Sequence, residues 1–359
     1  MKHIIKSSSF FIVLFLFTVY VFAQTDNPED TTVVIMENQE AELAYNNGVE
    51  AFSKKNYQEA LQAFNEALNY KPNFSKAYFN RGNVKVELKD YKGAIEDYTL
   101  AITNDTTGEM KKAYYFRGRA KQLSGDNVGA LQDYQTAIEK SFKDAKVYYY
   151  MGMIKFLDGD YQGALDAYNN AIRLDPKNAF AYNDRGSTYR KLKKYEEAVA
   201  DYKMATTLDP KMHFTFNNLG SVYRKLKKYD DAIASYTMAI NIKPDYYIAY
   251  NNRGNAKIDK KDYQGAIEDF NKAINLKKDY YFAYNNLGRA LMKQKKYEEA
   301  IKYFNKAIEI KNNFGVAFLN RGIAKEELRK FEEACKDWQK AKEYGVKIAE
   351  NYLQECKNN

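Results

Sequence analysis

The chain has 359 residues, with 56 Lys and Arg against 47 Asp and Glu, and a formal net charge of +9. This charge is moderate for the length, so it does not by itself indicate a nucleic-acid partner. Only two histidines and two cysteines are present, too few for the catalytic triads and zinc sites that depend on them, and no cofactor motif accompanies them. We therefore expect no enzyme activity, no metal and no cofactor.

The first 23 residues are typical of a secretory signal peptide. Lys2 and Lys6 precede a largely apolar run from Phe10 to Phe22, and Val21 and Ala23 flank a plausible cleavage site. An uncleaved membrane anchor is the alternative, but a spanning helix needs about 20 apolar residues, which is more than this run offers. Cleavage predicts an exported protein of a bacterial envelope, periplasmic or secreted.

Behind the signal, the chain divides into a leader, an array of repeats and a cap. Residues 24–40 are acidic and show no helical apolar pattern before about Val33, which predicts a flexible leader. Between residues 41 and 348 one unit recurs nine times with a period of 34 residues, except for one step of 36. The copies begin at residues 41, 75, 111, 145, 179, 213, 247, 281 and 315. Residues 349–359 are predicted to form a capping helix and tail, because the last repeat otherwise exposes an apolar face.

Each unit predicts two helices, helix A over about positions 1–14 and helix B over about positions 17–30. Position 8 is always glycine, and positions 20 and 27 are always alanine. Glycine inside a helix costs about 1 kcal/mol relative to alanine, so its recurrence at one position needs a packing reason. An aromatic at position 24, such as Tyr202 or Phe304, lies on the same face of helix B as the alanines.

This order of Gly, Tyr, Ala, aromatic, Ala and Pro at a period of 34 resembles the tetratricopeptide repeat. The resemblance covers residues 41–348. It implies an all-α fold, a right-handed superhelical α-solenoid of helix-turn-helix repeats with a C-terminal capping helix. It also implies that the inner face of helix A binds a protein or peptide.

Positions 7 and 23 change together among the copies. Five repeats have Arg at position 7 and Asp at position 23, and the other four have neither. The pairs are Arg81 with Asp97, Arg117 with Asp133, Arg185 with Asp201, Arg253 with Asp269, and Arg321 with Asp337. Residues that vary together usually touch, so we predict an ion pair between helix A and helix B of each of these repeats. The alternative is that the arginines reach a ligand.

Positions 2, 5, 6, 9 and 13 of helix A form one stripe, which carries many amides at positions 5 and 6. The candidate groove residues here are Asn183, Asn217, Asn218, Asn251, Asn252, Asn285, Asn286 and Asn320, with Arg289 at position 9. An amide donates and accepts at once, which suits the backbone of an extended peptide. The stripe is similar to the asparagine ladder of O-linked N-acetylglucosamine transferases, which grips substrate chains. The alternative is that these amides only keep a concave face hydrated.

The early repeats present an aromatic and basic groove instead. Its candidates are Tyr115, Tyr149 and Arg119, and it would suit an apolar or aromatic side chain of a partner. Relatives that bind chaperone tails use a two-carboxylate clamp with Lys at position 5. Position 5 is aromatic in these repeats, so the clamp is not transferred to this chain.

Two further features bear on partners and redox state. Pairs of basic residues, such as Lys193 and Lys194, recur at the turns between helices A and B, and either bind an anionic surface or remain solvated. Cys335 lies on the last helix B and Cys356 in the cap, so a disulfide and two free thiols both remain open.

Together these patterns predict a non-catalytic scaffold that holds an extended peptide or a partner protein. An accessory module that delivers substrates to a separate enzyme, or acts in envelope assembly or on a cell-surface polymer, is the alternative. A nucleic-acid partner is disfavoured by export and by the modest charge.

Overall fold

The computed structural model describes residues 28–356, in which nineteen helices and no strand are found. The predicted signal peptide, the start of the leader and the last three residues lie outside this range. The chain separates into two compact units between Ser124 and Gly125, and each unit is described by itself. Across the described range, every helix is too short or too polar to cross a membrane.

The first unit contains α1 (Pro28–Ser53), α2 (Tyr57–Tyr70), α3 (Ser75–Glu87), α4 (Tyr91–Thr103) and α5 (Lys111–Leu123). The second unit contains α6 (Asn127–Glu139), α7 (Ala145–Leu157), α8 (Tyr161–Leu174), α9 (Ala179–Lys191), α10 (Tyr195–Leu208), α11 (His213–Lys225), α12 (Tyr229–Ile242), α13 (Tyr247–Asp259), α14 (Tyr263–Leu276), α15 (Tyr281–Lys293), α16 (Tyr297–Ile310), α17 (Gly315–Glu327), α18 (Phe331–Glu343) and α19 (Ala349–Glu355). Odd-numbered helices up to α17 are helices A and even-numbered ones are helices B.

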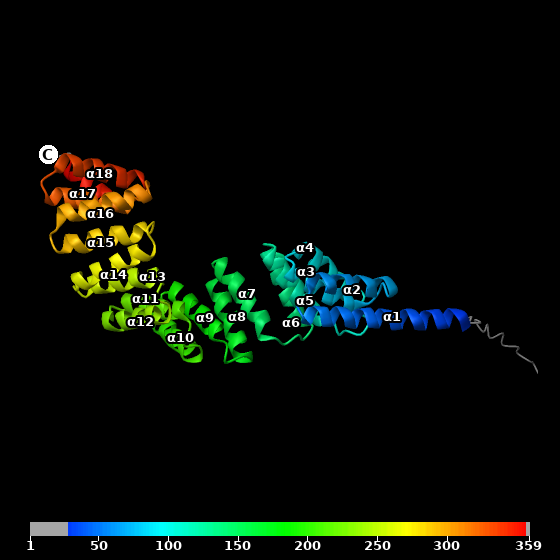
Figure 1. Ribbon diagram of the computed structural model, residues 1–359. Coiled ribbons are helices and arrows are strands. Elements are labelled where there is room, and N and C mark those ends of the chain that lie inside the picture. The colour runs from blue at the N-terminus through cyan, green and yellow to red at the C-terminus, as the bar shows by residue number, and fades with distance from the viewer. Residues whose placement is uncertain (1–27, 357–359) are drawn as a thin grey trace, which may run out of the picture. The chain divides into compact units, whose positions relative to one another are not determined.

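Within each unit, every helix packs against the next one along the chain, and each helix A also packs against the following helix A. Figure 1 shows this stacking of helix pairs, for example from α13 to α18 in the second unit. The all-α solenoid of helix-turn-helix repeats that the sequence predicts is confirmed.

The recurring basic residues lie in the tight turn between helices A and B. The residue at position 15 is left-handed in several repeats, with φ of +61° at Lys193, +59° at Lys227 and +70° at Lys261. Gly159 takes the equivalent place with φ of +82°. A left-handed residue after the last helical turn is a common helix C-cap, so these side chains mark a tight turn.

The leader differs from expectation. Helix α1 begins at Pro28, so residues 28–40 are helical where the sequence predicted a flexible segment. The side chains of Met36, Asn38 and Glu40 are exposed, whereas Ala41 is fully buried. The packed turns from Ala41 onward supply the costly helix nucleus, and each residue added before them gains one backbone hydrogen bond without needing apolar contacts.

The spacing that recurs in every repeat brings the position-8 glycine against the aromatic ring at position 24 of the same repeat. At Gly288, for example, an added Cβ atom would lie 2.6 Å from Cε1 of the Phe304 ring. The same close approach places Gly48 on Phe64, Gly82 on Tyr98, Gly152 on Tyr168, Gly186 on Tyr202, Gly220 on Tyr236, Gly254 on Phe270 and Gly322 on Trp338. The aromatic therefore fills the space above the glycine, which lets helices A and B approach closely.

Replacing Gly288 by alanine is expected to lower the free energy of unfolding by about 1–3 kcal/mol, although alanine is the better helix former. Phe304 is fully buried and has no room to move away from the added methyl group. Urea denaturation measures the effect. The same substitution should cost less in a Phe304→Leu background, since the two sites are in contact. Equal or greater stability of the Gly288→Ala protein would contradict the packing argument.

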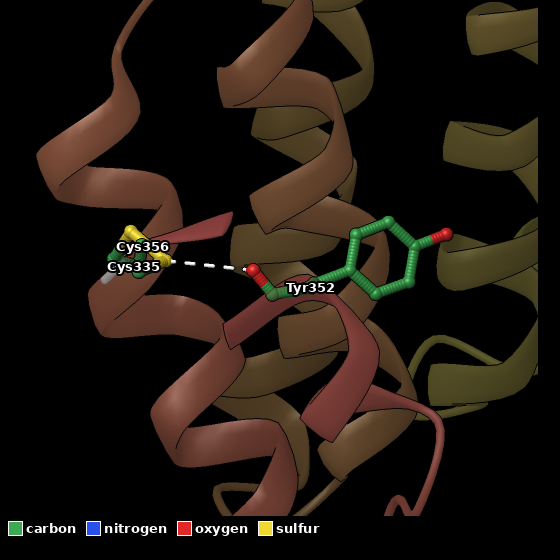
Figure 2. The surroundings of a disulfide bond; sticks show 3 residues. All are labelled: Cys335, Tyr352 and Cys356. Carbon is green, nitrogen blue, oxygen red and sulfur yellow. Dashed lines mark hydrogen bonds between the residues drawn. A yellow bond between two sulfur atoms is a disulfide. The ribbon is translucent and has the colours of Figure 1, made fainter. Parts of the chain in front are cut away.

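The C-terminal cap is joined to the last repeat by a disulfide. Cys335 on α18 and Cys356 at the end of α19 are bonded, with their Cα atoms 5.9 Å apart. Figure 2 shows the sulfur of Cys356 close to the backbone oxygen of Tyr352, at 3.6 Å. A disulfide sulfur carries no proton, so this is a packing contact and no hydrogen bond is donated. The ring of Tyr352 packs on Trp338, with ring centroids 5.0 Å apart.

Candidate protein-binding face

The amides at position 5 lie between neighbouring helices A. Asn183, Asn217, Asn251 and Asn285 are all buried, and Asn285 is only 4% exposed. The expectation that this row faces a groove, as a peptide ladder or as a hydrated surface, is therefore wrong. Position 5 does lie on the predicted stripe of helix A, but the next helix A covers these side chains.

These buried amides are bonded to the following repeat. The side-chain nitrogen of Asn252 donates to Asn217 Oδ1 at 2.9 Å, and that of Asn286 donates to Asn251 Oδ1 at 2.9 Å. The equivalent bonds join Asn320 to Asn285 at 2.8 Å and Asn218 to Asn183 at 3.4 Å. A buried amide without a partner would cost about 1–3 kcal/mol, so this row holds successive repeats in register.

Earlier repeats make the same contact with different groups. The Tyr149 hydroxyl donates to Asp184 Oδ2 at 2.9 Å, and Asn80 donates to the Tyr45 hydroxyl at 2.8 Å. Tyr149 is thus part of an inter-repeat contact. Tyr115 is buried on α5, so its predicted place in an open groove is wrong. Arg119 on α5 and Tyr149 on α7 belong to different units, so a groove shared between them stays a prediction.

Outside the buried row, the helices α9, α11, α13, α15 and α17 expose three rows of side chains, which we call the helix-A face. Position 2 supplies an apolar row, in which Phe180 is 52% exposed, Phe282 42% and Val316 41%. Position 6 supplies the partly exposed amides of Asn218, Asn252 and Asn320. Charged groups stand at Arg289 of position 9, at three of the five position-12 residues and at all five position-13 residues. Aromatic contacts continue the apolar row between repeats, with Phe180 and Phe214 stacked at 6.3 Å.

The arginines at position 7 lie elsewhere, against helix B. Arg253 donates from Nε and Nη2 to both carboxylate oxygens of Asp269, at 2.9 and 2.7 Å. The structure brings together in the same way Arg81 with Asp97, Arg185 with Asp201, and Arg321 with Asp337. Arg117 and Asp133 belong to different units, so their pairing stays a prediction.

Two further contacts of these Arg–Asp pairs were not predicted from the sequence. The third arginine nitrogen, Nη1, reaches position 25 of the preceding repeat, as in the bond from Arg253 to Thr237 Oγ1 at 3.0 Å. A lysine at position 11 adds a second cation, as Lys257 Nζ lies 2.9 Å from Asp269. Position 25 is Asn or Thr before each of the five arginines. That coincidence is the signal that would have revealed the contact between repeats.

A hollow of about 280 Å³ opens between α7 and α9. Met153, Phe156 and Leu157 line one side, and Asp184 and Arg190 line the other. The Nε atom of Arg190 is buried and has no hydrogen-bond partner. The hollow therefore combines apolar walls with an unused donor, which suits a mixed apolar and polar side chain of a partner.

Family models of the tetratricopeptide repeat match successive segments along the chain. The matched residues are 48–89, 75–107, 152–192, 179–212, 220–257, 254–295 and 281–314. The chain belongs to the tetratricopeptide repeat (TPR) family. No curated protein sequence matches it.

Solved structures show the same fold. A TPR protein from Parabacteroides merdae superposes with a TM-score of 0.57 at 20% identity, covering 68% of this chain and 97% of that one. PilF of Pseudomonas aeruginosa gives 0.51 at 18% identity, covering 60% and 96%. The Cut9 and Hcn1 hetero-tetramer of APC/C gives 0.51 at 14% identity, covering 91% and 86%.

One TPR position departs from its neighbours in a way that predicts a pH effect. Asp184 occupies position 6, where the next four repeats have asparagine. Burial raises the pKa of Asp184 above its usual value, although the hydrogen bonds from Tyr149 and Asn183 oppose the rise. A raised pKa in the folded state means that stability is lost as the pH rises through that pKa and the carboxylate ionises.

We expect Asp184→Asn to raise the melting temperature at pH 7. The gain should shrink as the pH falls below the raised pKa, because the wild-type carboxyl is then protonated and uncharged. Melting curves of both proteins between pH 7 and pH 4 test this. A variant less stable than the wild type at pH 7 would show that the charged hydrogen bonds of Asp184 outweigh its burial.

Proposed function

We propose that this TPR protein is a non-catalytic scaffold that binds an extended segment of a partner protein along the helix-A face of α9–α17. TPR folds support protein–protein interaction in general, and such proteins are generally scaffolds without catalytic activity. The observation that carries the proposal is the exposed apolar row at position 2. Monomeric soluble proteins rarely leave a contiguous apolar strip uncovered without a use for it.

The three rows suit one kind of ligand. Successive side chains of an extended peptide point in opposite directions, so one set can reach the apolar row and the other the charged groups at positions 9, 12 and 13. The partly exposed amides of the middle row then face the peptide backbone. Asn218, Asn252 and Asn320 each donate to the preceding repeat through the side-chain nitrogen. The side-chain oxygen of Asn252 accepts from Asn251 at 3.5 Å, and an amide oxygen can accept a second bond, so these oxygens can also accept from backbone N–H groups.

Affinity capture with paired variants tests this role. Phe180→Ser with Phe282→Ser should lose a partner that the wild-type protein retains, because two exposed anchors of the apolar row are removed. Met238→Ser is the matched control, since Met238 is 46% exposed on helix B of the same unit. Equal recovery by all three proteins would place binding elsewhere. Recovery of a separate enzyme or of a cell-surface polymer would favour the accessory role.

Export is part of the proposal. The predicted signal lies in residues 1–23, and the disulfide between Cys335 and Cys356 supports an oxidising compartment, because such bonds are rare in the cytosol. Fractionation of the producing cells, with sequencing of the mature N-terminus, tests it. A cytosolic protein that retains Met1 would overturn it.

A further inference from the structure

Three consecutive helices A bring charged side chains together on the helix-A face. Arg224 on α11 donates from Nε to Asp259 Oδ2 on α13, at 2.6 Å. Arg289 follows on α15 and reaches Asn255 on α13, one helical turn before Asp259, at 3.5 Å. The ion pair of Arg224 and Asp259 is about one-third exposed, so the cluster is open to solvent on one side.

Arg289 lacks a carboxylate of its own. Its Nη1 atom donates only to the amide oxygens of Asn286 and Asn255, at 3.3 and 3.5 Å. No ion pair among residues 28–356 includes it, whereas the position-7 arginines of the second unit each have a buried aspartate. Burial is the main cause of the lowered pKa of Arg289; the charge of Arg224 adds to it and the carboxylate of Asp259 opposes it.

The charged side chains that act on Arg289 are Arg224 and Asp259. Asp259 is the one carboxylate of this group, and it is already engaged by Arg224. The two arginines therefore share a single carboxylate, and an incoming carboxylate would complete the coordination that Arg289 lacks.

We propose that Arg289 and Arg224 receive the side-chain carboxylate of an internal Asp or Glu in the extended partner segment. This rests on the proposed function, because it assigns chemistry to the same face. The helix-A face continues past the site on both sides, onto α9 and α17, so a bound chain has room to extend in both directions. An internal acidic residue fits that geometry better than a chain end.

The position-2 row defines what lies beside the acidic residue. Positions 2 and 9 of one helix are about 10 Å apart along the axis. Adjacent residues of an extended chain point to opposite sides and can span such a gap between their side-chain tips. The partner segment should therefore alternate apolar and acidic residues, with the apolar ones on Phe282 and its neighbours.

Three labelled peptides with the core Leu-X-Leu-X-Leu test the inference by fluorescence anisotropy. The first has X = Glu with both ends blocked, the second X = Gln with both ends blocked, and the third X = Gln with a free C-terminal carboxylate. We expect the Glu peptide to bind the full chain at least tenfold more tightly than either Gln peptide at low salt. The preference should decrease at high salt, because the carboxylate reaches the site from solvent.

Arg289→Gln should lose at least tenfold in affinity for the Glu peptide only, and Arg289→Lys should retain part of it. Arg173→Gln is the control. Arg173 is exposed on α8, a helix B, and its replacement removes the same charge, so the affinity for the Glu peptide should not change. Melting curves establish that each variant is folded. If Arg289→Gln proves unfolded, the three-peptide comparison on the wild type and Arg289→Lys decides.

Equal affinity for Glu and Gln peptides would overturn the carboxylate site, as would preference for the free C-terminus. Failure of all three peptides to bind would also overturn it. The proposed function is judged separately, by whether the Phe180 and Phe282 variants lose a captured partner.

Discussion

Asp269→Asn is expected to lower the free energy of unfolding by about 3–5 kcal/mol. Asp269 is only 3% exposed and accepts from Arg253 through both oxygens and from Lys257 through one. Asparagine keeps the shape of the side chain but leaves two cations near each other without an anion. Because Arg253 also contacts Thr237 of the preceding repeat, the loss should spread to that interface.

Urea denaturation followed by circular dichroism measures the change. Asp230→Asn is the matched control, since Asp230 pairs with Lys260 but its side chain is 80% exposed. An exposed pair of this kind contributes about 0–1 kcal/mol, so the control should unfold almost as the wild type does. Similar small losses in both variants would show that Arg253 is stabilised without Asp269.

Removing the disulfide, by Cys335→Ser with Cys356→Ser, is expected to cost about 3 kcal/mol in the stability of the C-terminal repeat. The bond closes a segment of 21 residues that includes the turn between α18 and α19. The short helix α19 packs on α18, where Tyr352 covers Trp338. A seven-residue helix has little stability of its own, so its docking depends on this link.

Hydrogen exchange locates the effect. Amides of α18 and α19 should exchange faster in the double variant, whereas those of α13 and α14 should not, because repeats contact only their neighbours. Dithiothreitol should reproduce the change in the wild type and leave the variant unaffected, since the chain has no other cysteine. Unchanged exchange in α19 after reduction would show that packing alone holds the cap.

The candidate site was predicted only in part. The sequence places positions 2, 5, 6, 9 and 13 on one stripe, but Asn251 and Asn285, which it predicts to face a groove as a peptide ladder or a hydrated surface, are buried between repeats. Periodicity places a side chain on a face of its own helix. It does not say how far the next helix covers that face, since this depends on the angle between neighbouring repeats.

Local sequence pattern predicts the period of 34 residues and the helix pairs. Covariation of positions 7 and 23 among the copies predicts the bonds between Arg253 and Asp269 and their equivalents. Those relations hold inside a single helical hairpin, where spacing along the chain largely sets spacing in space. The bonds from Asn286 to Asn251 and from Arg253 to Thr237, and the uncompensated charge of Arg289, arise only where hairpins meet. Stacking determines which side chains are buried there, and so which remain available for a partner.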